Sequence, residues 1–201
     1  MQPTGFVGPV PKIANGATNV QFTQDNQGNQ LFSEYHARYY NAAYQGNLFS
    51  VANQAAVTTS STLNTTFTGL SLANPATSGV NLVLLQFYCA QFAVGAAAVV
   101  SIAGGSGVAA GSLTVRNALV GTSAKTATIA SASATITAPI LLRPVGSVGS
   151  LATTGYGLSQ SIVADLGGSI IVPPGNIVCS DTSVATTSAL IFGFLWQEIP
   201  V

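Results

Sequence analysis

The chain has 201 residues, enough for one well-buried domain or for a domain with an appendage. Only 5% of the residues are Asp, Glu, Lys or Arg, where an ordinary soluble domain carries roughly 25%. The net charge is zero, and the five Lys and Arg residues are scattered, which excludes the clustered positive charge that nucleic-acid binding requires. With 48% apolar residues the chain is not disordered, and its nearly uncharged surface indicates a protein that packs against others.

Residues 1–31 differ in composition from the rest of the chain. Prolines and glycines interrupt them, and isolated apolar residues such as Phe6, Val7 and Phe22 follow neither a helical nor a strand period. This pattern predicts an extended arm whose apolar side chains contact a neighbouring subunit or the chain's own domain. We therefore expect residues 1–47 to be the arm with its tyrosine-rich root, and residues 48–201 to be the folded domain.

The root, "FSEYHARYYNAAYQG", contains the single histidine, His36, and four of the six tyrosines. Alternating polar and apolar residues from 34 to 39 favour a strand. The alternative is a helix that pairs Tyr40 with Tyr44 and ends at Gly46. Tyrosine combines a large apolar ring with a polar tip, which suits protein interfaces. The residues expected at an assembly interface are the arm's apolar side chains and these tyrosines: Phe6, Val7, Phe22, Tyr35, Tyr39, Tyr40 and Tyr44.

From Leu48 onward, short segments rich in Val, Ile, Thr, Leu and Phe alternate with Gly, Asn, Ser and Pro. In the last segment, Leu190, Phe192, Phe194 and Trp196 form an apolar row with a period of two, which predicts a strand with that row facing the core. The segment "NLVLLQFYC" is apolar on both faces, as expected of a strand covered on each side by the sandwich core or by a neighbouring subunit. The turn "VPPGN" predicts a positive φ at Gly175. Eight to ten strands in about 150 residues are typical of an all-β, jelly-roll-like antiparallel β-sandwich.

The apolar run at residues 80–104 is long enough for a membrane-spanning helix. Gln86 and Gln91 interrupt it, no Lys or Arg flanks it, and Gly95 divides it into two strand-sized halves, so we expect two strands and no membrane partner. Cys89 and Cys179 lie in apolar, strand-like contexts, and two buried free thiols are favoured over a disulfide.

The sequence carries no recognisable catalytic pattern. His36 as a general base, oriented by Glu34 or Asp25, would need a nucleophile on a G-x-S-x-G turn, and the chain has none. The cysteines and His36 match no zinc spacing, and no glycine loop for phosphate is present. We therefore expect no enzyme activity, no catalytic residues, no cofactor and no metal site.

Arg143 lies inside the apolar segment "PILLRPVG". A buried guanidinium requires a partner, and Asp165 and Glu198 in the later strands are the candidates for a structural ion pair. The alternative is an edge strand that leaves Arg143 in water.

Five segments together resemble the virion proteins of tailed bacteriophages, above all their jelly-roll capsid-decoration, or cement, proteins. These segments are "RYYNAAYQGNLFSVANQAAVTT", "TGLSLANPATSGVNLVLLQF", "APILLRPVG", "GGSIIVPPGNIV" and "FGFLWQEIP". The resemblance spans residues 38–201 and concerns the alternation of short strands with turns and a few short motifs. It implies a homotrimer on the outside of a capsid, with residues 1–30 clamping neighbouring subunits.

The leading hypothesis is therefore a structural virion protein, assembled in the bacterial cytoplasm, whose partners are its own copies and a major capsid protein. A receptor- or glycan-binding module of a phage tail or fibre is the alternative, and a hydrolase of cell-surface sugars comes third. The glycan-binding hypothesis requires an open groove lined by aromatic residues. The hydrolase hypothesis requires an open groove lined by carboxylates.

Overall fold

The computed structural model describes residues 38–201 except 110, 122, 125, 150–159 and 188. The chain divides into two units between Tyr40 and Asn41, and the fold described below is that of residues 41–201. The predicted contact residues Phe6, Val7, Phe22 and Tyr35 lie outside the described residues. The first strand begins at Leu48, and the domain boundary expected at 47/48 stays a prediction.

The described residues form one short helix and nine strands, so the expected all-β class is confirmed. In chain order they are α1 (Tyr40–Tyr44), β1 (Leu48–Ala52), β2 (Thr66–Ala73), β3 (Val80–Gln91), β4 (Ala98–Ala109), β5 (Arg116–Asn117), β6 (Ile129–Val148), β7 (Ser161–Val172), β8 (Asn176–Thr182) and β9 (Leu190–Pro200).

The helix α1 corrects part of the expectation for the tyrosine-rich root. Arg38 and Tyr39 form a turn rather than a strand, and the rest of the expected strand lies outside the described residues. The helix ends as the alternative predicted, because Gly46 has a φ of 75° and donates to the carbonyl of Ala43 at 3.0 Å. Asn47 donates to the carbonyl of Ala42 at 3.0 Å, which completes a Schellman motif at the helix end.

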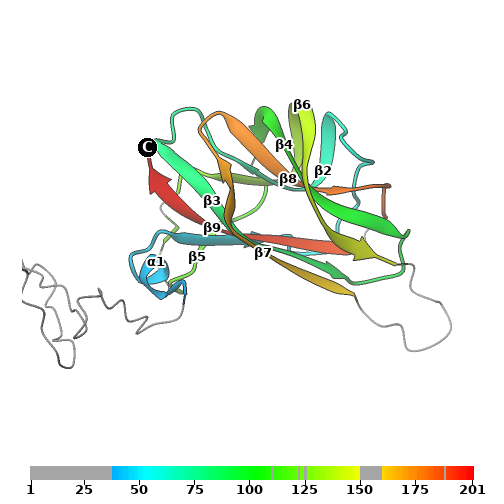
Figure 1. The fold of residues 1–201 in the computed structure, drawn as a ribbon, viewed down its shortest axis with the longest axis horizontal. Coiled ribbons are helices and arrows are strands. Elements are labelled where there is room, and N and C mark those ends of the chain that lie inside the picture. Colours follow the sequence, from blue (N-terminus) through cyan, green and yellow to red (C-terminus); the bar gives the residue numbers. More distant parts are fainter. Residues whose placement is uncertain (1–37, 110, 122, 125, 150–159, 188) are drawn as a thin grey trace, which may run out of the picture. The chain divides into compact units, whose positions relative to one another are not determined.

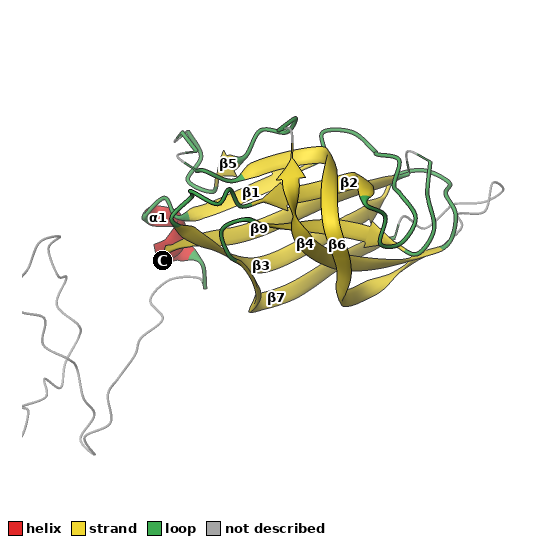
Figure 2. Cartoon of the chain, turned by 90° about the horizontal axis from the view of Figure 1, so that it is seen from above, coloured by secondary structure: helices red, strands yellow, loops and turns green. Residues whose placement is uncertain are grey.

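Two antiparallel sheets pack face to face, and the strand order is that of a jelly roll. One sheet has the order β5-β1-β9-β3-β7 (Figure 2), and the other contains β2, β6, β4 and β8. Apart from β5, the first strand pairs with the last, β2 with β8, β3 with β7 and β4 with β6. The chain is thus one long antiparallel ribbon rolled into two layers, which is the double Greek key of a jelly roll (Figure 1).

The second sheet closes on itself because β6 is long enough to serve two neighbours. Its first part pairs with β2, and its remainder pairs with β4. A small second core lies within this closed sheet, with members including Ile177 and Cys179, while Val178 between them belongs to the main core. Strand β8 is therefore covered on both faces, which explains why six consecutive residues, Ile177–Thr182, are buried.

Small residues in the 104–138 region let β4 and β6 approach each other closely. A Cβ atom on Gly107 would lie 2.2 Å from the carbonyl oxygen of Thr135, so no larger residue fits there without moving β6. The small side chains of residues 104–109 and 129–138 thus serve the pairing of β4 with β6 within the chain.

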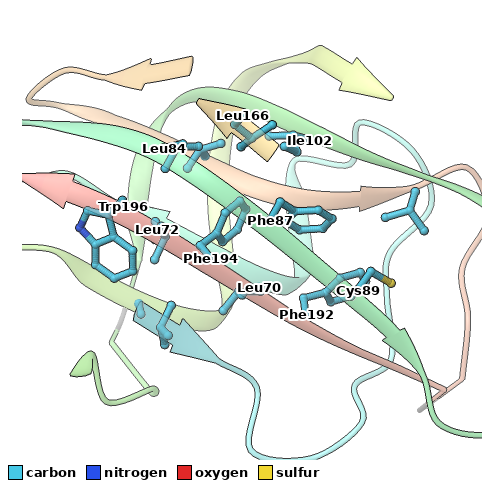
Figure 3. Close-up of a cluster of buried hydrophobic side chains, with 14 of the residues drawn as sticks. Leu70, Leu72, Leu84, Phe87, Cys89, Ile102, Leu166, Phe192, Phe194 and Trp196 are labelled. Carbon is cyan, nitrogen blue, oxygen red and sulfur yellow. The ribbon is translucent and has the colours of Figure 1, made fainter. Parts of the chain in front are cut away.

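The main core lies between the two sheets, and aromatic residues of β9 and β3 form its centre (Figure 3). The predicted inward row of Leu190, Phe192, Phe194 and Trp196 is confirmed, since all four side chains are buried. The ring centroid of Phe87 lies 5.0 Å from that of Phe194 and 6.0 Å from that of Phe192. At these distances aromatic pairs stabilise the core beyond the area that they bury.

Three further expectations are confirmed. The run at residues 80–104 forms β3 and β4 with Gly95 between them. Within the described part of the chain no helix is long and apolar enough to cross a membrane, and the expected absence of a membrane partner stays a prediction. Gly175 takes a φ of 82° in the turn between β7 and β8. Cys89 and Cys179 are free and buried, and burial raises the pKa of the Cys89 thiol to about 12.

Replacing Phe87 with alanine tests the importance of the aromatic core. Phe87→Ala leaves a cavity between the sheets and should lower the free energy of unfolding by about 3–5 kcal/mol. Denaturant unfolding followed by the fluorescence of Trp196, the one tryptophan in the chain, measures the loss. The matched control is Phe92→Ala, because the Phe92 side chain is 74% exposed and its removal should change stability by less than about 0.5 kcal/mol. Equal losses in the two variants would contradict this account of the core.

Candidate assembly interface

The predicted interface tyrosines are described only in part. Tyr40 and Tyr44 are exposed and lie one turn apart on α1, whereas Tyr39 is half-buried and its ring lies 5.2 Å from the guanidinium carbon of Arg38. A role for these tyrosines in assembly stays a prediction.

The three candidates for a structural ion pair have different surroundings. Arg143 is exposed and donates to the Ser169 hydroxyl at 3.2 Å, in agreement with the alternative that leaves it in water. Asp165 is also exposed and accepts a hydrogen bond of 3.0 Å from the backbone N–H of Gly167. Glu198 is buried, and two hydroxyl groups of the segment before β6 donate to its carboxylate. The pairing of Arg143 with either acid stays a prediction.

The buried carboxylate of Glu198 connects β9 to the segment that precedes β6. Its Oε1 atom accepts a hydrogen bond of 2.7 Å from the Thr128 hydroxyl and another from the Thr126 hydroxyl. The indole N–H of Trp196 lies 3.5 Å from the same oxygen. A buried carboxylate with several donors is a structural anchor, because each donor offsets part of the cost of burying the charge.

A second buried carboxylate, Asp181, lies at the end of β8. Its Oδ1 atom accepts a hydrogen bond of 3.1 Å from the backbone N–H of Leu63. Burial raises the pKa of this carboxyl, and the hydrogen bond from Leu63 opposes the increase. The neighbouring hydroxyls of Thr59, Thr182 and Thr186 bond to one another, so a polar network connects β8 to the loop between β1 and β2. Across the residues that the structure describes, no group of three or more His, Cys, Asp or Glu side chains is arranged to hold a metal.

The most distinctive surface is the outward side of the sheet β5-β1-β9-β3-β7, here called the outer face. Residues on alternate positions of each strand point away from the core. They include Ser50 and Ala52 of β1, Val83, Gln86, Tyr88 and Ala90 of β3, Arg116 of β5, Val163, Asp165 and Ile171 of β7, and Ile191, Gly193, Leu195 and Gln197 of β9.

The outer face is unusually apolar for a surface of a sandwich. An antiparallel sheet that faces water normally carries polar residues at its outward positions. Here Val163 is 66% exposed and Ile171 is 55% exposed, and Val83, Ile191 and Leu195 are half-buried beside them. An extended apolar surface of this kind marks a site that another molecule covers. Cover by a neighbouring subunit, the second of the two alternatives for the doubly apolar strand β3, stays a prediction.

A hollow of about 520 Å³ lies in the outer face where Gly193 leaves the sheet without a side chain. Tyr88 lies beside it, and a Cβ atom on Gly193 would be 3.2 Å from the Tyr88 ring. The Tyr88 hydroxyl donates to the side-chain carbonyl of Gln86, which holds the ring in place. On the other side of Gly193 the register places Ala52, so a large and a small side chain flank the hollow.

One row of the outer face carries charge at both ends. The registers place Arg116, Ser50, Leu195, Gln86 and Asp165 side by side across the five strands. Neighbouring strands lie about 4.8 Å apart, so Arg116 and Asp165 are separated by roughly 19 Å. At that distance they do not contact each other within one chain.

A second apolar surface lies on β6, in the part that pairs with β4 alone. Ile140, Leu141 and Leu142 are all exposed there, on consecutive positions. An exposed apolar edge segment promotes association with other chains.

The sequence indicated part of this outer face and missed the rest. Apolar residues on both faces of β3 predicted an apolar outward side, whereas the aromatic residues expected at an interface were those of the tyrosine-rich root and did not include Tyr88. Gly193 and Arg116 had no local signal at all, because their significance depends on which strands lie beside them. The described geometry thus adds a defined surface to the predicted arm.

Comparisons of the chain with protein-family models, with curated proteins and with solved structures find no match.

The buried carboxyl of Asp181 predicts a pH dependence of stability. Because its pKa is raised in the folded state, the folded protein holds the proton more tightly than the unfolded chain does. The free energy of unfolding should therefore fall as the pH rises from about 4, the ordinary value for Asp, through the raised value. Asp181→Asn keeps a neutral acceptor for Leu63, so the variant should lack this fall and exceed the original protein in stability at neutral pH. Denaturant unfolding of both proteins at a series of pH values measures it, and parallel profiles would contradict the assignment.

Proposed function

We propose that the chain is a structural virion protein that decorates and stabilises a phage capsid by associating with copies of itself and with a major capsid protein. The observation that carries the proposal is the apolar outer face on a jelly roll with very few charged residues. Such a surface requires cover, and a repetitive shell of identical subunits offers it at every position.

Two features of the chain support assembly with more than one neighbour. The outer face and the exposed segment Ile140–Leu142 lie on different sheets, so two separate surfaces are available for contact. The charge content of 5% leaves little electrostatic repulsion between copies. Under this proposal the predicted arm of residues 1–47 connects neighbouring subunits, and the homotrimer implied by the resemblance is the assembly unit.

The alternative is a receptor- or glycan-binding module of a phage tail or fibre, and the hollow beside Tyr88 favours it. Sugars stack on aromatic rings, and a hollow of about 520 Å³ falls in the size range of ligand sites. The apolar lining favours a protein partner over a sugar, because a glycan site requires several convergent hydrogen-bonding groups.

Mass spectrometry of purified virions of a phage that encodes this chain tests the proposal. Virions are separated into heads and tails, and the chain is quantified in each fraction. We expect many copies in the head fraction, and heads lacking the gene should release their DNA at a lower temperature. Adding back the purified chain should restore the temperature at which DNA is released. Recovery in the tail fraction would favour the alternative, and absence from virions would overturn both.

A further inference from the structure

We infer that the outer face binds the outer face of a second copy of this chain, related by a two-fold axis that lies between the two faces, above β9 and parallel to that strand. The inference deepens the proposed function and rests on its premise that the chain works by self-association. It names the surface, the partner and the relative orientation of the two copies.

The position of β9 at the middle of the five-stranded sheet makes this arrangement self-consistent. A two-fold axis along β9 places β1 of one copy over β3 of the other, and β5 over β7. Face-to-face sheets in sandwiches keep their strands within about 30° of parallel, and this axis preserves that alignment. The contact is isologous, so it closes with two copies.

Charge complementarity selects this axis. Because Arg116 and Asp165 occupy opposite ends of one row, the axis along β9 brings Arg116 of each copy over Asp165 of the other. An axis across the strands would instead bring Arg116 over Arg116 and Asp165 over Asp165. The long side chain of Arg116 covers the offset that the crossing of two aligned sheets introduces. The two contacts between copies are therefore oppositely charged pairs, and the backbone N–H of Gly167 already orients the Asp165 carboxylate.

Size complementarity agrees with charge. Under the same axis, Tyr88 of one copy faces Ala52 of the other, across the hollow at Gly193. The large ring of Tyr88 thus meets a small side chain of the partner, and the two-fold symmetry repeats this contact. Leu195 lies on the axis and meets its own copy, which buries an apolar side chain at the centre of the contact.

The alternative of pairing through the edge strand β7 is disfavoured by its backbone. Between Ile170 and Asp165 the register of β7 against β3 is broken, and Gly167 and Gly168 have φ values of 54° and 82°. A bulge of this kind twists an edge strand away from regular pairing with another strand. The face of the sheet is therefore a better site for a second copy than the edge at β7.

The expected affinity is modest. The five strands span about 24 Å, and the three open rows at Ile191, Gly193 and Leu195 span about 20 Å, so each copy buries roughly 500 Å². The row of Gln197 is left out because Leu48 on β1 is already buried there. A total near 1,000 Å² is at the lower limit for specific interfaces. Association should therefore be measured over a range of protein concentration, and it should weaken at high salt because the charged pairs lie at the rim.

Charge exchange between the two ends of the row tests the inference. Arg116→Glu and Asp165→Arg each convert both attractive contacts into repulsive ones, and each variant alone should dimerise roughly tenfold or more weakly. An equimolar mixture of the two variants should regain dimers, since every contact between unlike variants is again between opposite charges. The double variant should also regain them. Thr137→Glu, which adds a negative charge at an exposed position of β6 in the other sheet, is the control and should leave association unchanged.

Sedimentation velocity of the full-length chain from about 1 to 100 µM measures the masses. We expect a mass that doubles with concentration, from one chain to two, or from three to six if the proposed trimer also forms. Melting temperatures of the variants show whether each one still folds. A mass that stays constant over the range, or a mixture that fails to restore association, would overturn the inference. A third outcome would also overturn the inference: the Arg116→Glu variant associating with the original chain more strongly than either protein associates with itself. That result would indicate the axis across the strands, where residue 116 of one copy faces residue 116 of the other.

The outcome is separable from that of the proposed function. Virions that contain the chain, combined with a pure chain that forms no such pair, would leave the proposed function intact and remove the inference. Pairs in solution, combined with virions that lack the chain, would remove the proposed function and leave the pairing of the outer faces intact.

Discussion

Burial of the aromatic row of β9 against the second sheet is the interaction on which the rest of the structure depends. Strand β9 is the central strand of its sheet, and Phe192, Phe194 and Trp196 occupy the middle of the main core. Its neighbours β1 and β3 come from the first half of the chain, so the core forms only when the end of the chain returns to the beginning. Because nearly all strand pairs are distant in sequence, we expect folding to be slow relative to that of helical domains of this size.

The second sheet shows how a chain with few large residues builds a second layer. Close approach of β4 and β6 at Gly107 allows the sheet to close, and closure buries the inner faces of β8 and β4. Small side chains contribute little by hydrophobic burial alone. Here they allow the backbones of β4 and β6 to approach each other closely. Polar contacts complete this layer. The hydrogen bonds of Asp181 and of the neighbouring threonines connect β8 to the loop before β2.

Scarcity of charge gives each exposed charge on the outer face more weight. Where ten charged residues serve 201 positions, an arginine and an aspartate at opposite ends of one row dominate the electrostatics of that surface. In a protein with ordinary charge content, the same pair would be two among many and would select no orientation. The apolar face between them supplies affinity, and the two charges supply direction.

Local patterns in the sequence determined the all-β class, the inward row of β9, the turn at Gly175, the helix end offered at Gly46 and the burial of both thiols. Each depends on residues that are close in the chain, where periodicity and turn chemistry act directly. Tertiary structure alone decided that residues 129–148 form one strand with two partners, that the 104–138 region serves an internal contact, and that Arg143 is exposed. It also decided the outer face, since Arg116, Ser50, Leu195, Gln86 and Asp165 share a row only through the registers of five strands. Registers between distant strands are set by packing of the whole core, and no local pattern contains that information.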